Sequence, residues 1–128
     1  MNVAKTHPNE EPMTKAERHA VIAQQNDQFR QTWGADFTIP GQILCTPGIT
    51  EKGFGFEVAV MKAVMQFDDF TKDNSPYGER DFGSLTIEDV RIFWKFDLYD
   101  ADYQGGTPDA TNPAVTRRVL TIMLPEEY

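Results

Sequence analysis

Residues 90–99 read VRIFWKFDLY, and apolar side chains recur at every second position of this stretch. Successive side chains of a β-strand point to opposite faces of a sheet, so the alternation predicts a strand. One set of side chains should face a core, whereas the intervening set, which includes Lys95 and Asp97, is half polar. We expect the core to contain Val64, Phe67, Ile92, Trp94, Phe96, Leu120 and Ile122.

Two further strands are predicted beside this one. Residues 81–87 precede it across the short link Glu88-Asp89, which favours an antiparallel hairpin. Residues 116–124 (TRRVLTIML) fit either a strand, the interpretation we favour, or a short helix. If that strand is regular, either Arg117 or Arg118 faces the core, where we expect charge-assisted bonds to a carboxylate to hold it.

Two helices are predicted in the first half of the chain. Residues 14–17 (TKAE) form the T-x-x-E pattern of a capping box, and the helix formers that follow carry one apolar stripe. Gly34 is a natural end for this helix. Between residues 56 and 70, apolar side chains recur at spacings of three and four, which predicts a second helix over this range.

The order of the predicted elements indicates the fold class. Residues 42–46 predict a short strand that ends in a turn at residues 47–48. Helix, strand, helix and three strands then follow one another without the regular alternation of an α/β protein. We therefore predict an α+β fold, with two helices on one face of a mostly antiparallel sheet of about four strands. Residues 1–13 are polar and aperiodic, so we expect a flexible tail before a single domain, residues 14–128.

The composition of the chain excludes several classes of protein. With 128 residues it is long enough for one core of ordinary size. Its net charge of −8 argues against direct binding to nucleic acid, because no excess of positive charge displaces counterions from phosphates. One cysteine excludes an intrachain disulfide framework, and no apolar run approaches the roughly 18 residues of a membrane span. The start of the chain lacks the apolar core of a signal peptide, so we expect a soluble cytoplasmic protein without membrane contacts.

Several segments together resemble a family of small bacterial proteins that is known only as a domain of unknown function and is common in alphaproteobacteria and on their plasmids. These segments are IAQQNDQFR (22–30), QILCTPG (42–48), FDDFTKDN (67–74), YGERDFG (77–83), IFWKFDLYD (92–100) and NPAVTRRVLTIMLPEEY (112–128). The last two are specific. The resemblance implies a shared fold, and it brings no activity, substrate or catalytic residue.

Acidic residues are concentrated between residues 68 and 102. This stretch holds ten Asp and Glu against four Lys and Arg, so it carries −6 of the total charge of −8. Aromatic side chains lie among the acids, as is typical of protein-binding surfaces and equally of residues that pack beneath loops. A basic protein partner would be attracted to such a surface, and the attraction would weaken with salt. The residues that we select as a binding set are Asp73, Tyr77, Glu79, Asp81, Asp97, Tyr99 and Asp100.

Other interpretations of the acidic stretch stay open. Asp and Asn side chains bond to nearby backbone amides in turns, so turn chemistry alone can explain the loop. Oxygens of Asp73, Asn74, Glu79 and Asp81 could instead bind a divalent cation, although the spacing of an EF-hand is missing. The same acids, together with Asp97, could also serve an enzyme of unknown reaction.

Neither a nucleophile nor a cofactor site is predicted. Cys45 lies in a predicted strand, where a lone cysteine is most often a buried apolar side chain. The chain has no G-x-S-x-G, P-loop or G-x-G-x-x-G motif. For Asp97 the simplest partner is an ion pair with Lys95 or Arg91. The leading hypothesis is a small module that binds a basic protein through its acidic half, for instance by presenting carboxylates where that partner would bind phosphates.

Overall fold

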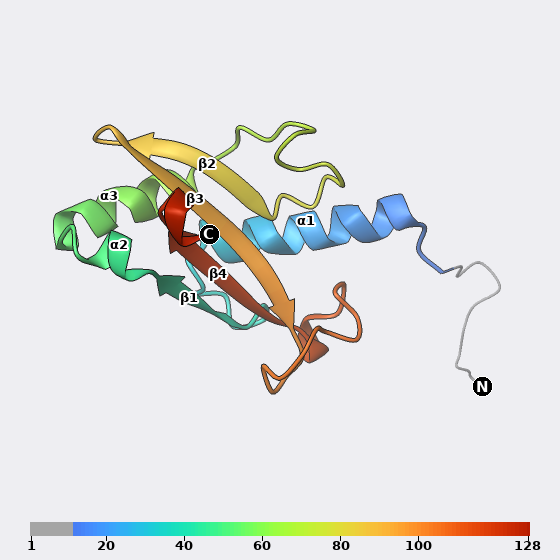
Figure 1. Ribbon diagram of the computed structural model, residues 1–128. Helices are drawn as coiled ribbons and strands as arrows, with labels where there is room; N and C mark the ends of the chain where they lie inside the picture. Colours follow the sequence, from blue (N-terminus) through green and yellow to red (C-terminus); the bar gives the residue numbers. More distant parts are fainter. Residues whose placement is uncertain (1–11) are drawn as a thin grey trace.

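The computed structural model describes residues 12–128, and the predictions for residues 1–11 of the expected tail lie outside this range. Four strands form one sheet in the order β1-β4-β3-β2 (Figure 1), which confirms the predicted α+β class. Within residues 12–128, no helix combines the length and the apolar character needed to cross a membrane. The elements are α1 (Lys15–Gln31), β1 (Gly41–Cys45), α2 (Pro47–Thr50), α3 (Phe54–Met65), β2 (Phe82–Ile87), β3 (Val90–Tyr99), η1 (Pro113–Val115), β4 (Arg117–Met123) and η2 (Pro125–Glu127).

The predicted hairpin is confirmed in β2 and β3, and its turn explains its register. Glu88 and Asp89 both have positive φ angles, 50° and 67°, which the favoured two-residue hairpin turn requires. This turn sets Gly83 opposite Trp94. A side chain at Gly83 would collide with the Trp94 indole, so the absence of a side chain there leaves room for the largest residue of the core.

β4 confirms the strand interpretation of the last segment, and the helical alternative is wrong. The strand pairs with β3 in antiparallel fashion and with β1 in parallel fashion, so the sheet is mixed but mostly antiparallel. Parallel neighbours cannot be joined by a tight turn. The long connection from β1 to β4 therefore contains α2, α3 and the whole β2–β3 hairpin.

Specific contacts fix the ends of the two long helices. The Thr14 hydroxyl accepts a hydrogen bond from the Glu17 N–H (3.1 Å), and the Glu17 carboxylate accepts one from the Thr14 N–H (2.8 Å), which confirms the capping box. α3 ends at Met65, five residues before the predicted end. Arg30 of α1 donates to the carbonyl oxygens of Val64 (2.6 Å) and Met65 (3.2 Å), so a side chain from another helix satisfies the last turn of α3.

The short helix α2 lies where we predicted a simple turn, so residues 12–128 contain three α-helices rather than two. The Glu127 carboxylate of η2 holds the start of α2. It accepts hydrogen bonds from the Thr46 hydroxyl (2.5 Å), the Gly48 N–H (2.9 Å) and the Leu124 N–H (2.9 Å). These hydrogen bonds hold the pKa of Glu127 below its usual value. They also tie the end of the chain to the end of β1.

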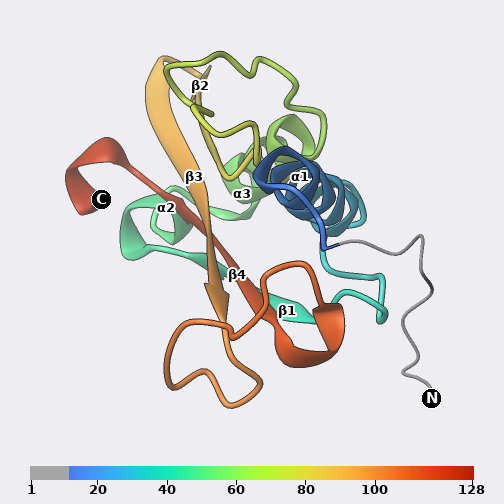
Figure 2. The same cartoon turned by 90° about the vertical axis from the view of Figure 1, so that its right-hand side faces the viewer.

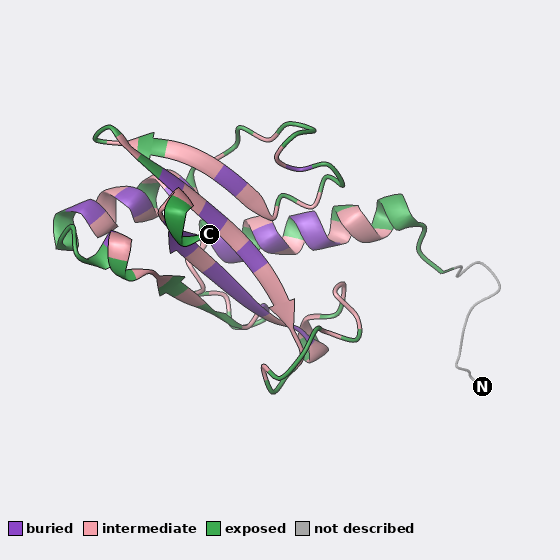
Figure 3. Ribbon diagram, in the orientation of Figure 1, coloured by how far each residue is buried: buried purple, intermediate pink, exposed green. Residues whose placement is uncertain are grey.

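α1 and α3 pack on one face of the sheet, which we call the inner face (Figure 2). Buried residues recur along β3 and β4 (Figure 3). The predicted core is confirmed except at Phe67, which is only half-buried. Because α3 ends early, Phe67 and Phe70 reach the core from the following loop and pack edge-on against Trp94. The fully buried predicted residues are Val64, Ile92, Trp94, Leu120 and Ile122, and Phe96 is 6% exposed.

Candidate functional site

The opposite face of the sheet, the outer face, carries the strand residues that alternate with the core. Phe93 of β3 and Phe82 of β2 lie on this face with their rings 5.1 Å apart. The turn η2 crosses the outer face in Figure 1 and stands on the side away from α1 in Figure 2. Tyr128, just beyond it, lies 6.1 Å from each phenylalanine ring. Phe82, Phe93 and Tyr128 form what we call the aromatic cluster.

A hollow of about 440 Å³ beside the aromatic cluster gathers three of the predicted binding residues. Asp73 comes from the loop after α3, Asp81 immediately precedes β2, and Asp97 belongs to β3. Three carboxylates and one ammonium group give this acidic hollow a formal charge of −2. Its lining residues are Asp73, Asn74, Pro76, Asp81, Phe82, Lys95, Phe96, Asp97 and Tyr128.

Two carboxylates of the acidic hollow have different environments. Asp97 Oδ2 lies 2.9 Å from Lys95 Nζ, which confirms the predicted ion pair, and this hydrogen bond raises the pKa of Lys95. Asp81 is half-buried, and this burial, together with the nearby carboxylates of Glu79 and Asp97, raises the pKa of Asp81. The fold therefore holds the ionised Asp81 at an energetic disadvantage, as is common for groups that serve a function.

Replacing Asp81 should show this disadvantage directly. A carboxyl group with a raised pKa in the folded state stabilises the fold at low pH, and this contribution is lost as the pH rises through the folded-state pKa. Asp81→Asn should therefore raise the free energy of unfolding at pH 7 by roughly 0.5 kcal/mol, and the gain should shrink toward pH 4. Thermal denaturation at several pH values measures it, with the exposed Asp73→Asn as the control. A destabilised Asp81→Asn protein at pH 7 would contradict this account.

The structure separates Tyr77 and Glu79 from the acidic hollow and places them against α1. Glu79 Oε2 lies 2.6 Å from His19 Nδ1. Tyr77 is 71% exposed, and its ring stacks on the same imidazole at a centroid distance of 5.5 Å. These side chains line a second hollow of about 420 Å³, whose lining residues are Lys15, Arg18, His19, Ile22, Tyr77 and Glu79.

The remaining two predicted residues lie where β3 ends: Tyr99 is the last residue of the strand, and Asp100 begins the loop that follows. The Asp100 carboxylate accepts hydrogen bonds from the N–H groups of Asp102 (3.1 Å) and Gln104 (3.0 Å). The Tyr99 ring lies 6.3 Å from that of Tyr103. Turn chemistry therefore explains the hydrogen bonds of Asp100, and neither Tyr99 nor Asp100 lines either hollow.

The four oxygen donors considered for a divalent cation do not converge. Asp73, Asn74 and Asp81 line the acidic hollow, whereas the Glu79 side chain turns to His19. Among residues 12–128, no three His, Cys, Asp or Glu side chains are grouped closely enough to hold a metal ion. The sequence could not predict that Glu79 and Asp81 point to different sites, because the two residues are only two positions apart in the chain.

Arg118 corrects the expectation of a buried arginine bound to a carboxylate. Its side chain is buried on the inner face, and its Nε donates to Oδ1 of Asn26 in α1 (2.8 Å). Asn26 in turn donates from Nδ2 to the backbone oxygen of Glu79 (3.0 Å). Desolvation lowers the pKa of Arg118 to about 10. Arg118 has an amide partner rather than a carboxylate because the α1 residue that faces it, on the apolar stripe of the helix, is Asn26.

The sequence did not predict three residues that complete the aromatic cluster and the second hollow. Phe82 and Tyr128 complete the aromatic cluster, and His19 completes the second hollow. The alternation of β2 could have placed Phe82 on the outer face, since Gly83 and Leu85 belong to the other set. Nothing local predicts that Tyr128 packs against Phe82 or that His19 meets Glu79, because both contacts join distant parts of the chain.

The fold and the site define an α+β protein with an acidic hollow where β2 begins, beside an aromatic cluster on the outer face of the sheet. Residues 45–127 match the family described as Protein of unknown function (DUF3768), and because this match covers more than half of the chain, the protein belongs to that family. No curated protein and no solved structure matches the chain. The matched segment begins at the end of β1 and ends at Glu127, whose carboxylate binds Thr46 and Gly48.

Proposed function

We propose that this protein is a binding module whose outer face docks a basic protein surface. The observation that carries the proposal is the juxtaposition of the acidic hollow and the aromatic cluster. Tyr128 belongs to both, and Lys95 lies over its ring at 5.8 Å. Aromatic anchors surrounded by charged groups are the residues that dominate binding energy at protein interfaces.

The charge of the chain supports a basic partner. A net charge of −8 attracts positively charged surfaces over distances of about one Debye length, roughly 8 Å at physiological salt. Asp81 adds a specific attraction. The carboxylates of Glu79 and Asp97 repel its ionised form, and a bound cation would offset this repulsion and stabilise that form. One specific form of the proposal is a partner whose nucleic-acid-binding surface receives these carboxylates in place of phosphates.

Neutralising the three carboxylates of the hollow should weaken binding. The probe is a fluorescently labelled peptide rich in Arg and Lys, and its affinity for the full chain is followed by fluorescence anisotropy. The variant Asp73→Asn/Asp81→Asn/Asp97→Asn should bind at least about tenfold more weakly, a loss of about 1.4 kcal/mol.

The matched control neutralises three exposed carboxylates away from the hollow, Glu51→Gln/Glu88→Gln/Asp89→Asn. Both triple variants change the net charge by the same amount, so a purely long-range attraction would weaken equally in the two. We expect the control to stay within about twofold of the unmodified chain. Equal weakening in both variants would contradict a binding site in the acidic hollow.

A second candidate function is an enzymatic one, and the contact between His19 and Glu79 favours it. A carboxylate that orients an imidazole is the arrangement of a general base, and here it lies in a hollow beside Tyr77. Activated ester and phosphate-ester substrates test this candidate. Turnover that is lost in both His19→Gln and Glu79→Gln would support it, whereas turnover unchanged in the two variants would exclude a role for the pair.

The proposal includes a cytoplasmic setting in a bacterium, alphaproteobacterial by the resemblance of the segments noted above. Cys45 is a free thiol, and unpaired cysteines are usual in reducing compartments. Burial, with the nearby Glu57 carboxylate, raises the pKa of Cys45, so its thiol is protonated and unreactive at neutral pH.

A further inference from the structure

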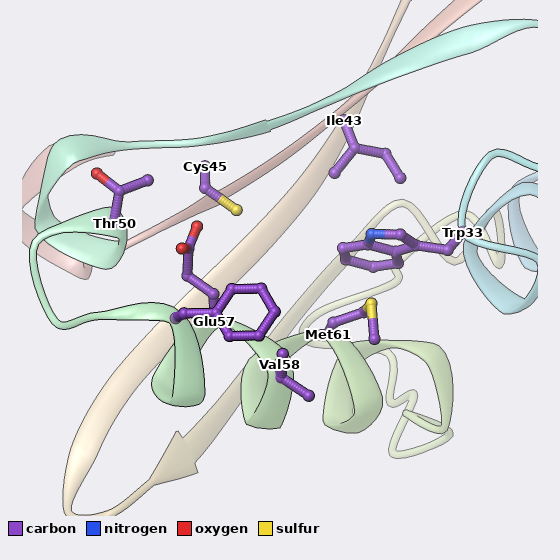
Figure 4. A pocket seen from close by; sticks show the side chains of 8 residues that line it. Trp33, Ile43, Cys45, Thr50, Glu57, Val58 and Met61 are labelled. Atoms are coloured by element: carbon purple, nitrogen blue, oxygen red, sulfur yellow. The ribbon is translucent and has the colours of Figure 1, made fainter.

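A second surface lies at the edge of the sheet farthest from the acidic hollow. There, a groove of about 440 Å³ runs between β1 and α3 (Figure 4). Ile43 and Cys45 point into it from β1, and Val58 and Met61 line it from α3. Trp33 closes one end. The residues that line the groove are mostly apolar, and Glu57 contributes a carboxylate to it.

The strand beside this groove has an open edge. β1 pairs with β4 alone in the sheet that residues 12–128 form. The Pro40 carbonyl accepts from the Arg118 N–H, and the Thr46 N–H donates to the Ile122 carbonyl. Alternate residues of a strand bond to the same neighbour, so the even-numbered residues face β4. The N–H and C=O groups of residues 41, 43 and 45 therefore point to the open edge.

β1 is short and is flanked by Pro40 and Pro47, but the strand itself lacks the other devices that usually protect an edge. Its sequence, GQILC, contains neither a charge nor a proline. Leu44 is 49% exposed on the outer face, and Phe54, at the start of α3, is 80% exposed. The other edge strand, β2, is flanked at its two ends by Asp81 and by the Glu88-Asp89 turn. An uncharged edge strand next to an apolar groove is the arrangement that accepts an added strand.

We propose that β1 pairs with β1 of a second copy of this chain, in antiparallel fashion about a twofold axis. The result is a continuous sheet in the order β2-β3-β4-β1-β1-β4-β3-β2, with the two α3 helices facing each other beneath the junction. In an antiparallel register centred on Ile43, Gln42 of one copy lies opposite Leu44 of the other, and Gly41 lies opposite Cys45. No charged residues therefore face each other across the junction.

Charge selects a second copy as the occupant. The acidic hollows lie on β2 and β3, so the sheet order places them at the two far ends of the dimer. Two chains of net charge −8 thus meet along β1, whose five residues carry no charged side chain. The groove beside β1 offers a basic partner one carboxylate, that of Glu57, whereas the acidic hollow offers three. The twofold pairing also leaves both outer faces free, so the dimer does not depend on the proposed function.

Sedimentation velocity of the full chain over a dilution series tests this inference. We expect a dimer of two 14.5-kDa chains that dissociates on dilution. Leu44→Lys puts a new lysine from each copy into the junction and should weaken dimerisation by at least about tenfold. Thr86→Lys, an exposed outer-face position of β2, is the matched control and should leave the dimer intact. A monomer at every concentration, or a dimer that Leu44→Lys leaves unchanged, would overturn the inference.

Hydrogen exchange of the unmodified chain gives a second test that requires no variant. The amides of Gly41, Ile43 and Cys45 should exchange more slowly in concentrated than in dilute solution, because only the dimer protects them. Amides in the middle of β3 should show the same exchange at both concentrations. Concentration-independent exchange at residues 41, 43 and 45 would exclude the β1 junction even if the chain self-associates elsewhere.

Discussion

Trp94→Ala is expected to lower the free energy of unfolding by about 3–5 kcal/mol, a large part of the stability of a small domain. Trp94 is fully buried on the inner face. Phe67 and Phe96 pack edge-on against it at 5.4 and 6.0 Å, and the Arg30 guanidinium lies over its ring at 5.2 Å. Removing the indole leaves a cavity, because its neighbours belong to α1, to β3 and to the loop after α3 and cannot all move inward to fill it. Denaturant titration measures the loss.

Phe93→Ala is the matched control for Trp94→Ala. Phe93 is the adjacent residue of the same strand, but it lies half-buried on the outer face, between Phe82 and Tyr128. Its truncation should cost only about 1 kcal/mol, because much of its surface meets water in the folded state. Similar losses for the two variants, or a loss below about 1 kcal/mol for Trp94→Ala, would contradict the assignment of the two faces.

The second large effect is expected at the buried pair of Asn26 and Arg118. Within residues 12–128, Nη1 and Nη2 of Arg118 have no hydrogen-bond partner, so its Nε bond to Asn26 is the contact that stabilises the buried guanidinium. Asn26→Leu removes this contact and leaves the charge without a partner. The expected loss is about 2–4 kcal/mol in the free energy of unfolding.

A double-mutant cycle tests that explanation. Arg118→Met removes the buried charge itself, and the double variant Asn26→Leu/Arg118→Met replaces the pair with apolar side chains of similar volume. The double variant should be more stable than Asn26→Leu alone, with a coupling energy of at least about 1 kcal/mol. Additive losses in denaturant titrations would show that the two side chains act independently and would contradict the proposed role of the hydrogen bond.

The hairpin and the first helix could be predicted because their signals are local. Alternation along β3 assigned its two faces, and the capping box located the start of α1. The end of α3 could not be predicted, because Arg30, more than 30 residues earlier in the chain, satisfies its last carbonyl groups. The parallel pairing of β1 with β4 is equally non-local, and no pattern within GQILC reports it.

The candidate site was predicted in part for the same reason. Asp73, Asp81 and Asp97 were selected for their charge, and the hairpin register together with the loop before β2 brings them together. Glu79 was selected on the same ground, yet its neighbour in space is His19, on a helix that precedes it by about 60 residues. Charge along a sequence identifies candidates, but long-range packing decides which of them share a surface.

The most direct measurement of the central claim is a titration of the isotope-labelled full chain with the Arg- and Lys-rich peptide, followed by backbone amide shifts. We predict saturable shifts concentrated at the outer face, at Phe82, Phe93, Lys95 and Asp97, which weaken as salt is added. The amides of β1 and α3 should move little. Shifts concentrated at β1 and α3, or no saturable shift at low salt, would contradict binding through the acidic hollow and the aromatic cluster.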